Sequence, residues 1–370
     1  MITTSAWVLY KDTAIRGLVE EEFSFPDIEE HEVLAEPIYG CWEGNMTHAI
    51  DRKPINIALV RREPKVVIGN AGVVRVVKVG ASVTNVRAGE TCIFTGGSSL
   101  DAYGYSKSAH GYDARNSVGL LAKKMKADGK LFFPIPENTK HSLEQWAGFS
   151  LRYLTAWSNW HVANKAFRIQ TSIEDLAAPH VWGWGGGTTL AELDLAKRMG
   201  CSTHMISGSD QHLEQIASMG IGAIDRREFA SIDPQTADKK SYLKAIKAFL
   251  ATVKEKTANE GVSIFIDYIG SPVYNASLRA LGRQGVITTA GWKLGMELST
   301  NRASECISRH IHVYTHGWRF QEIPDAMQYA ETENWMPEIG KVWSWNEIPK
   351  LAKAHKHDAI DSYFPIFNVN

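Results

Sequence analysis

The stretch 180–190 reads HVWGWGGGTTL, and the interpretation of the whole chain starts from it. Three consecutive glycines, 185–187, separate a short apolar run from a segment, 190–199, with helical spacing of apolar residues. Glycines at a strand-to-helix turn let the backbone approach a pyrophosphate, which then lies at the positive end of the helix. A tight connection with small residues for packing is the alternative, but packing alone does not need three glycines. The positions expected to contact a dinucleotide are Gly183, Gly186, Gly187, Thr188 and Thr189.

Strand-like and helix-like segments alternate from Pro179 onward. Strands are expected at 180–183, 203–207, 223–225, 263–269, 286–290 and 311–314. Helices are expected between them, at 190–199, 211–219, 241–257 and 274–281. Strands joined by such crossovers predict a parallel, doubly wound sheet with helices on both faces. Ligands of these sheets bind at the carboxyl ends of the strands, so Gly270, Ala290 and Gly291 are expected to approach the cofactor.

The end of the second of these strands indicates which dinucleotide is bound. NAD sites usually place an acidic side chain here, where it accepts a hydrogen bond from the ribose 2′-hydroxyl. This chain has Ser207 at that place and a second hydroxyl at Ser209. Small donors without a carboxylate suit a 2′-phosphate, so NADP(H) is favoured over NAD. Two features argue the other way: no Arg or Lys follows nearby, and Asp210 adds a negative charge.

The first 135 residues or so have a different pattern, with short strands separated by turn residues. Strands are expected at 5–10, 32–38, 66–79 and 91–95, and their alternation is typical of antiparallel strands that are wet on one side. Helical spacing begins near Ser142, and a strand-like segment, 341–343, occurs close to the C-terminus. The fold class is therefore α/β, with a small β-barrel domain and a doubly wound domain. The expected boundaries are 1–160 with 316–370 for the barrel domain and 161–315 for the nucleotide-binding domain.

Composition excludes several classes of protein. The chain has 370 residues, of which 40 are basic and 41 acidic, so no excess of positive charge favours nucleic acid as a partner. No apolar run approaches the roughly 18 residues that cross a bilayer, and the first residues do not resemble a signal peptide. The four cysteines are far apart and form no CxxC pair, which argues against a zinc ribbon or a redox dithiol. We expect a reduced, cytoplasmic protein without a membrane segment.

Several short motifs, in this order along the chain, resemble those of the medium-chain dehydrogenase/reductase superfamily. They are GNAGVV at 69–74, AGE at 88–90, FPIPE at 133–137, YLTAW at 153–157 and ASLRAL at 276–281. Each motif is modest alone, but their order is specific and spans nearly the whole chain. The resemblance implies a GroES-like barrel domain joined to a Rossmann domain. It also implies that Thr155 lies near the nicotinamide, unless its hydroxyl merely bonds back to its own helix.

The chain departs from the superfamily pattern at three places. Thr189 stands where the family loop, (A/G)xxGxxG, has its last glycine, so either its Cβ moves the helix or its hydroxyl binds phosphate. Asn70 and Ala71 replace the His-Glu pair of zinc-dependent members, and Glu43 and Leu151 stand near the positions of their ligand cysteines. One carboxylate and at most one thiolate do not make a three-ligand zinc site. The resemblance is therefore to a zinc-independent member with no bound metal.

Within the superfamily, residues 181–183, Ser207 and 315–317 are most similar to the crotonyl-CoA reductase/carboxylase branch, with the quinone oxidoreductases also near. Members of this kind typically reduce an activated carbon–carbon double bond. The resemblance thus implies an NADP(H)-dependent enoyl reductase acting on a small molecule, an α,β-unsaturated thioester or ketone. Two alternatives stay open: a carbonyl reductase or alcohol dehydrogenase on the same scaffold, and a nucleotide-binding protein without net redox turnover.

Two residues are candidates for the catalytic loop. The segment 40–48 stands where the family places its loop facing the nicotinamide, and within it Glu43 and Asn45 could orient substrate or relay a proton. A purely structural role is at least as well supported for both. The strand at 311–314 is expected at an edge of the sheet, where pairing of equivalent edges would give a homodimer.

Overall fold

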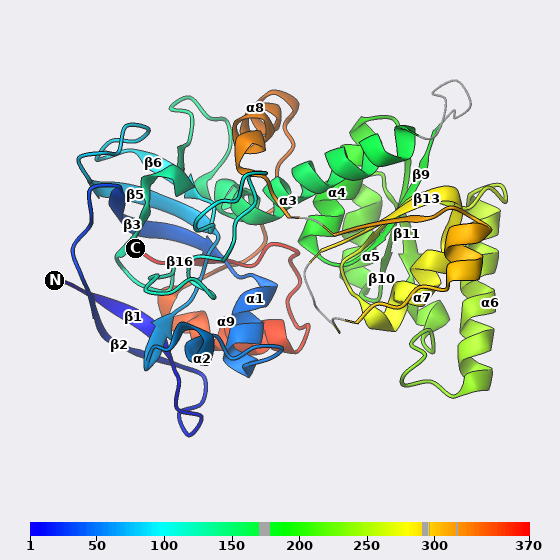
Figure 1. The fold of residues 1–370 in the computed structure, drawn as a ribbon, viewed down its shortest axis with the longest axis horizontal. Coiled ribbons are helices and arrows are strands. Elements are labelled where there is room, and N and C mark those ends of the chain that lie inside the picture. Colours follow the sequence, from blue (N-terminus) through cyan, green and yellow to red (C-terminus); the bar gives the residue numbers. More distant parts are fainter. Residues whose placement is uncertain (170–177, 291–294, 296, 316) are drawn as a thin grey trace. The chain divides into compact units, whose positions relative to one another are not determined.

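The computed structural model describes residues 1–169, 178–290, 295, 297–315 and 317–370 (Figure 1). The chain divides into two compact units. The first unit comprises Met1–Leu154 and Arg319–Asn370, and the second comprises Thr155–Trp318. Helix α3 (Leu143–Arg168) contributes its first part to the first unit and its last part to the second. Each unit is described by itself below.

The second unit is built on a parallel sheet of six strands. These are β9 (His180–Trp184), β10 (Ser202–Ser207), β11 (Gly222–Asp225), β12 (Val262–Asp267), β13 (Leu281–Thr289) and β14 (His312–Thr315). Their order in the sheet is β11-β10-β9-β12-β13-β14, and all neighbouring strands are parallel. The chain thus winds outward from β9 in one direction and then, from β12, in the other. This is the Rossmann order, in which ligands bind where the winding reverses, and it confirms the predicted fold class.

Helices follow the strands as the crossover rule requires. They are α4 (Gly187–Arg198), α5 (Asp210–Ser218), α6 (Lys239–Lys256) and α7 (Ser271–Ala280), with shorter helical turns at Arg226–Phe229 and Arg302–Ile307. Helix α4 begins three residues before the predicted start, because Gly187 already adopts helical geometry. Strand β13 begins at Leu281, where the prediction still had a helix, since α7 passes directly into the strand.

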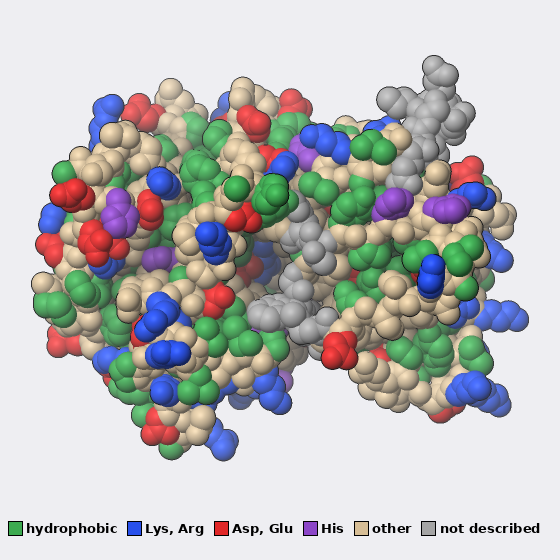
Figure 2. Space-filling view, in the orientation of Figure 1, with side chains coloured by type: hydrophobic (Ala, Val, Ile, Leu, Met, Phe, Trp, Pro, Cys, Tyr) green, Lys and Arg blue, Asp and Glu red, His purple; other side chains and the backbone are tan. Residues whose placement is uncertain are grey.

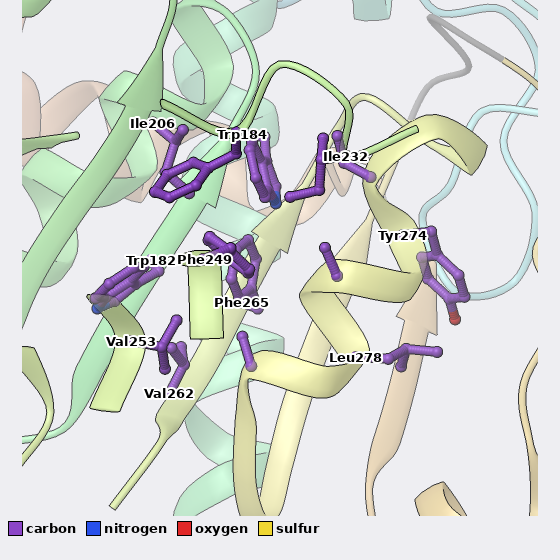
Figure 3. Close-up of a cluster of buried hydrophobic side chains, with 14 of the residues drawn as sticks. Trp182, Trp184, Ile206, Ile232, Phe249, Val253, Val262, Phe265, Tyr274 and Leu278 are labelled. Atoms are coloured by element: carbon purple, nitrogen blue, oxygen red, sulfur yellow. The ribbon is translucent and has the colours of Figure 1, made fainter. Parts of the chain in front are cut away.

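Large aromatic side chains fill the space between the sheet and helices α6 and α7 (Figure 3). Trp182 and Trp184 are two residues apart on β9 and therefore point to the same face of the sheet, where both contact Phe249 of α6. The ring centroids of Trp184 and Phe249 lie 5.2 Å apart, and Trp184 stacks on Phe265 of β12 at 6.0 Å. Each such side chain contributes about 1.5–3 kcal/mol through burial, so this cluster anchors the strand that leads into the glycine loop.

The first unit contains two sheets. One has three strands, β1 (Ile2–Tyr10), β2 (Leu18–Phe25) and β4 (Lys65–Val67). The other has the order β15-β16-β3-β5-β6-β8, with β7 also paired to β3. Its strands are β3 (Glu32–Cys41), β5 (Gly72–Val79), β6 (Thr91–Phe94), β7 (Met125–Asp128), β8 (Phe132–Pro134), β15 (Val342–Trp343) and β16 (Ile366–Asn368). Except for the parallel pair β15–β16, the strands pair antiparallel, as expected for a GroES-like domain.

The C-terminal segment completes the larger sheet of this unit. Figure 1 shows the red end of the chain among the blue and cyan strands, where β16 pairs antiparallel with β3. The remaining helices are α1 (Gly44–Asp51), α2 (Ile57–Arg61), α8 (Ile323–Glu333) and α9 (Ile348–Lys356), with short 3-10 turns at Gly129–Leu131, Phe320–Glu322 and Trp345–Glu347.

One predicted strand of this unit is wrong. The run 66–79 was expected to be a single strand, but it forms β4 and β5, which belong to different sheets. Gly69, with a φ of 110°, turns the chain between them, and a Cβ at Gly72 would lie 2.3 Å from the Tyr39 carbonyl oxygen. The run is apolar enough to read as one strand. The two glycines, one for the turn and one for close backbone approach, divide it.

The surface carries charges of both signs. On the face shown in Figure 2, Lys and Arg side chains are scattered among Asp and Glu side chains, so neither sign dominates that face. Within the described residues, no helix combines the length and the apolar character that a membrane crossing requires.

Candidate functional site

The amino end of α4 is the first part of the candidate site. Gly186 is the N-cap residue and provides no side-chain cap, and Gly185 has a φ of 147°, which favours glycine. The amide groups of Gly187, Thr188 and Thr189 have no hydrogen-bond acceptor among the described residues, and a Cβ at Gly186 would meet no atom within 4 Å. Free amides at the positive end of a helix, beside open space, are suited to a phosphate group.

Thr189 lies directly beneath this loop. Its side chain is fully buried, and its hydroxyl donates to the Trp184 carbonyl oxygen at 3.0 Å. A Cβ on Gly183 would lie 2.5 Å from Thr189 Cγ2, and one on Gly185 would lie 2.2 Å from Thr189 Oγ1. Thr189 therefore occupies space that these two glycines leave. Its hydroxyl donates to the protein backbone, so only its backbone amide is available to bind a phosphate.

The carboxyl end of β10 carries the second part of the site, and here the structure corrects the sequence analysis. No basic residue follows Ser207 closely in sequence, yet Arg226 lies beside it in space. Ser207 pairs with Asp225 of β11, and a Cβ on Gly208 would lie 3.2 Å from both Nε and Nη2 of Arg226. Parallel neighbours end at the same edge of the sheet, so β11 delivers a guanidinium group where β10 ends. The signal in the sequence was the Arg226-Arg227 pair directly after a predicted strand.

The two arginines of this pair differ in their partners. Arg227 binds Asp225 with a 2.7 Å separation and also pairs with Asp210, the acidic residue that had argued against NADP(H). Hydrogen bonds from Arg227 hold the pKa of Asp225 below its usual value. Arg226 is exposed and forms no ion pair within the part of the chain that the structure describes. A free guanidinium therefore lies next to the Ser207–Ser209 segment.

The loop after β12 is held from below by a buried carboxyl. Asp267 is fully buried and accepts hydrogen bonds from the amides of Ile269 at 3.1 Å and Gly270 at 3.0 Å. Ser277 donates to its other oxygen at 2.7 Å and accepts from the indole of Trp184 at 2.8 Å. Burial raises the pKa of Asp267 to about 6. This network shapes the turn at Gly270, which has a φ of 102°.

The other predicted cofactor positions are distributed over three elements. Ala290 follows the end of β13, and Ser209 is the N-cap residue of α5, without a side-chain cap of its own. Thr155 lies half-buried on α3. Gly291 lies outside the described residues. These assignments stay predictions.

In the first unit, Glu43 forms a buried ion pair. It is the N-cap residue of α1 and only 7% exposed, and both of its oxygens accept from Arg152 Nε, at 3.1 and 2.9 Å. Arg152 also donates to the Trp42 carbonyl at 2.8 Å and to the Tyr363 carbonyl. The cation compensates the Glu43 charge and joins α3 to the end of β3 and to the C-terminal segment. This geometry favours a positioning role for Glu43 over direct proton transfer.

Two asparagines of the same unit have buried oxygens without a partner. Asn45 Oδ1, in the first turn of α1, and Asn70 Oδ1, just before β5, accept no hydrogen bond from the described residues. Buried polar groups are normally paired, so unpaired ones point to a ligand or water. Asn45 was a predicted site residue. Asn70 was singled out only as the residue that replaces the zinc-binding His of the family, and that replacement was the available signal.

The described residues bring no three His, Cys, Asp or Glu side chains together in a way that could hold a metal ion. Burial, and then the neighbouring Glu43 carboxylate, raise the pKa of the Cys41 thiol well above its ordinary value. A thiol in this state stays protonated at neutral pH and is a poor metal ligand.

Comparisons with known proteins agree with this architecture. Residues 187–332 match the family model described as zinc-binding dehydrogenase. The solved crotonyl-CoA carboxylase/reductase AntE in complex with NADP is 18% identical, with a TM-score of 0.81 over 99% of this chain and 95% of that one. The Streptomyces 2-octenoyl-CoA carboxylase reductase CinF, in complex with NADP and 2-octenoyl-CoA, is 17% identical, with a TM-score of 0.83 over 99% and 87%.

A protein described as an alcohol dehydrogenase of Sinorhizobium meliloti is also similar. It is 18% identical, with a TM-score of 0.76 over 99% of each chain. A search of the curated proteins finds no match. These likenesses establish the two-domain fold.

Proposed function

We propose a function on the premise that this chain has the fold of the medium-chain dehydrogenase/reductase superfamily, as its motifs, the family match and the solved structures all indicate. The protein is an NADP(H)-dependent oxidoreductase that reduces an α,β-unsaturated thioester or ketone by hydride transfer to the β-carbon. The observation that carries the cofactor assignment is the unpaired Arg226 guanidinium beside Gly208, at the end of the strand next to the glycine loop.

Each part of the second unit has a role in holding the cofactor. The amides of Gly187, Thr188 and Thr189 bind the pyrophosphate at the amino end of α4. Arg226 and the hydroxyls of Ser207 and Ser209 bind the 2′-phosphate, since a guanidinium forms strong charge-assisted hydrogen bonds to phosphate. The nicotinamide end is bound by Thr155, Gly270, Ala290 and Gly291. The bound nucleotide supplies the hydride, and the protein supplies orientation and electrostatics.

In the first unit, Asn45 and Asn70 are the groups proposed to contact the substrate. Turning either amide over places its Nδ2–H, a donor, where the unpaired Oδ1 lies. Such a donor, aimed at a carbonyl oxygen, stabilises the negative charge that collects there when a hydride adds to the β-carbon. Glu43, held by Arg152, positions the first turn of α1 and with it Asn45. Zinc has no part in this proposal, because Asn70 stands in place of a ligand histidine and Cys41 is buried as a neutral thiol.

The cofactor assignment is tested by titrating the purified protein with NADPH and NADH, following ligand fluorescence and assaying metal on the same sample. Arg226→Ala should weaken NADPH binding about tenfold or more and leave NADH binding nearly unchanged, because only NADPH has the 2′-phosphate. Arg227→Ala is the matched control, since Arg227 is already paired with Asp210 and Asp225. Failure to bind either nucleotide would refute the proposal.

The reaction is tested by turnover. With NADPH, reduction of enoyl thioesters or enones in preference to aldehydes supports the proposed chemistry. Preference for aldehydes would favour the second candidate, a carbonyl reductase or alcohol dehydrogenase, which the likeness to the Sinorhizobium protein supports. Tight binding with no turnover of any acceptor would indicate a nucleotide-binding protein instead.

The proposed assembly is a cytoplasmic homodimer. Within the described residues β14 pairs only with β13, and Val313 on β14 is 41% exposed. An edge strand of this kind can pair with its equivalent in a second copy. Light scattering coupled to gel filtration would give twice the chain mass of 41.1 kDa if the proposal holds, and a monomer would contradict it.

A further inference from the structure

A buried polar cluster in the second unit has no part in the function proposed above. Glu192 of α4 is fully buried, and the Tyr268 hydroxyl donates to its Oε2 at 2.6 Å. Asn159 of α3 donates from Nδ2 to the same oxygen at 3.1 Å, and it also bonds to the Tyr268 hydroxyl. One carboxyl thus connects α3, α4 and the segment that follows β12.

Each of these three segments carries a predicted cofactor position. Thr155 lies four residues before Asn159 on α3, and Thr188 lies four residues before Glu192 on α4, so each pair shares one helix face. Tyr268 lies two residues before Gly270. Its amide donates at 3.3 Å to the Trp184 carbonyl, which also accepts from the Thr189 hydroxyl. The cluster therefore fastens the segments on which the cofactor site depends.

The cluster holds its carboxyl without a cation. Tyr268 is the one titratable side chain that faces Glu192 among the described residues, and Asn159 from α3 is neutral. On α4 itself, the nearby acid Asp194 is paired with Arg198. Burial raises the pKa of Glu192 to about 8, so the carboxyl stays protonated at neutral pH. Asn159 Oδ1 is buried and unpaired among the described residues, so a half-turn of the amide gives the carboxyl proton an acceptor.

We propose that Glu192 is a positioning residue for the dinucleotide: by holding Asn159 and Tyr268 together, it sets the three segments that carry Thr155, Thr188 and Gly270. The inference rests on the proposed function, because it assigns Glu192 to the same cofactor site. Ionisation of Glu192 replaces a neutral cluster with a buried, uncompensated charge. Cofactor binding should therefore weaken as the pH rises through the titration of this residue.

The test is the dissociation constant of NADPH between pH 6 and pH 9.5 for the whole chain and three variants. In the native protein, binding should weaken above about pH 8. Glu192→Gln keeps the shape and an acceptor for Tyr268 but has no proton to lose, so it should bind normally at pH 6 and stay level to high pH. Glu192→Ala should bind about tenfold or more weakly at every pH, because the segments lose their common anchor.

Asp194→Asn is the matched control, because it removes an acid from the same helix without touching the cluster, and it should keep the native profile. A native pH profile in Glu192→Gln would overturn the inference. If Glu192→Ala does not fold, the profile of Glu192→Gln still decides the question. Native protein that binds no NADPH at any pH would refute the proposed function itself, a result distinct from normal binding that is insensitive to Glu192.

Discussion

Glu43 of the first unit and Glu192 of the second are both buried, but they have opposite surroundings. Glu43 is 7% exposed and shares its charge with Arg152, whose Nε lies 2.9 Å away. Glu192 is fully buried, and its partners Tyr268 and Asn159 carry no charge. A buried carboxylate must be paired with a cation or take up a proton, because isolated charge is costly to bury. Glu43 is paired with a cation, and Glu192 takes up a proton.

The two glutamates show two ways in which a buried carboxyl group is stabilised. An ion pair such as Glu43–Arg152 depends on both partners, so loss of either one leaves a buried charge behind. A protonated carboxyl such as Glu192 depends on pH instead of on a second charged residue. The predictions below test this contrast from its largest expected effect to its smallest.

Removal of Arg152 should have the largest effect on stability. Arg152→Met leaves Glu43 as a buried unpaired charge and removes the donor to the Trp42 and Tyr363 carbonyls. The free energy of unfolding should fall by about 3–5 kcal/mol, measured by urea denaturation.

The double variant Glu43→Gln with Arg152→Met is the control for this measurement. Because it removes the uncompensated charge, it should recover part of the loss, and the cycle isolates the pair. A loss below about 1 kcal/mol in the single variant, the range of exposed ion pairs, would mean that Glu43 does not depend on Arg152.

Substitution of Glu192 should have an effect that grows with pH. The pKa of this carboxyl is raised from 4.5 in the unfolded chain to about 8 in the folded protein. Between these values the unfolded chain has released the proton and the folded protein has kept it, so stability falls as pH rises. Glu192→Gln escapes this loss. The free energy of unfolding of Glu192→Gln minus that of the native protein should therefore increase by about 1.4 kcal/mol per pH unit within that window.

The same comparison contains its own check. Because both proteins share every other titrating group, including Asp267, their difference reports Glu192 alone. Below about pH 4.5 and above about pH 8 the difference should be level. A difference that stays constant across the whole range would show that Glu192 is ionised in the folded protein at neutral pH.

The smallest effect is expected at Asp194, on the same helix as Glu192. Its ion pair with Arg198, at 3.0 Å, spans one helical turn and is partly open to solvent. Asp194→Asn should lower the free energy of unfolding by about 0.5 kcal/mol, as helical pairs of this spacing do, and added salt should reduce the difference. A pH-dependent effect as large as that of Glu192 would contradict the contrast drawn between the two acids.

Local patterns predicted much of the second unit. Five of the six strands were placed within two residues of their observed bounds, because each has a short apolar run between turn residues. The sixth, β13, begins five residues before its predicted start, and the glycine loop lies where α4 begins. The prediction of a single strand at 66–79 was wrong for a related reason, because the apolar pattern continues through Gly69 and Gly72. Only the sheet assignments show that this run forms two strands.

Two residues of the candidate site could not be assigned from local patterns. Arg226 is far from Ser207 along the chain, and the pairing of β10 with β11 brings them together. Glutamate residues on helices are usually exposed, so Glu192 did not stand out. The segment LAELDLA at 190–196, however, has apolar residues on every side of the helix. That segment was the signal for a buried helix, and it did not identify the partners that a buried acid needs.

The sequence by itself determined the alternation of strands and helices, the glycine loop and the superfamily resemblance, because these depend on neighbours along the chain. Only the tertiary structure decided which polar groups are left for a ligand. Arg227 is paired and Arg226 is free, Glu43 is compensated and Glu192 is not, and the Thr189 hydroxyl is taken by Trp184. Hydrogen bonds and charges are satisfied by whatever lies nearest in space, and the fold sets that distance.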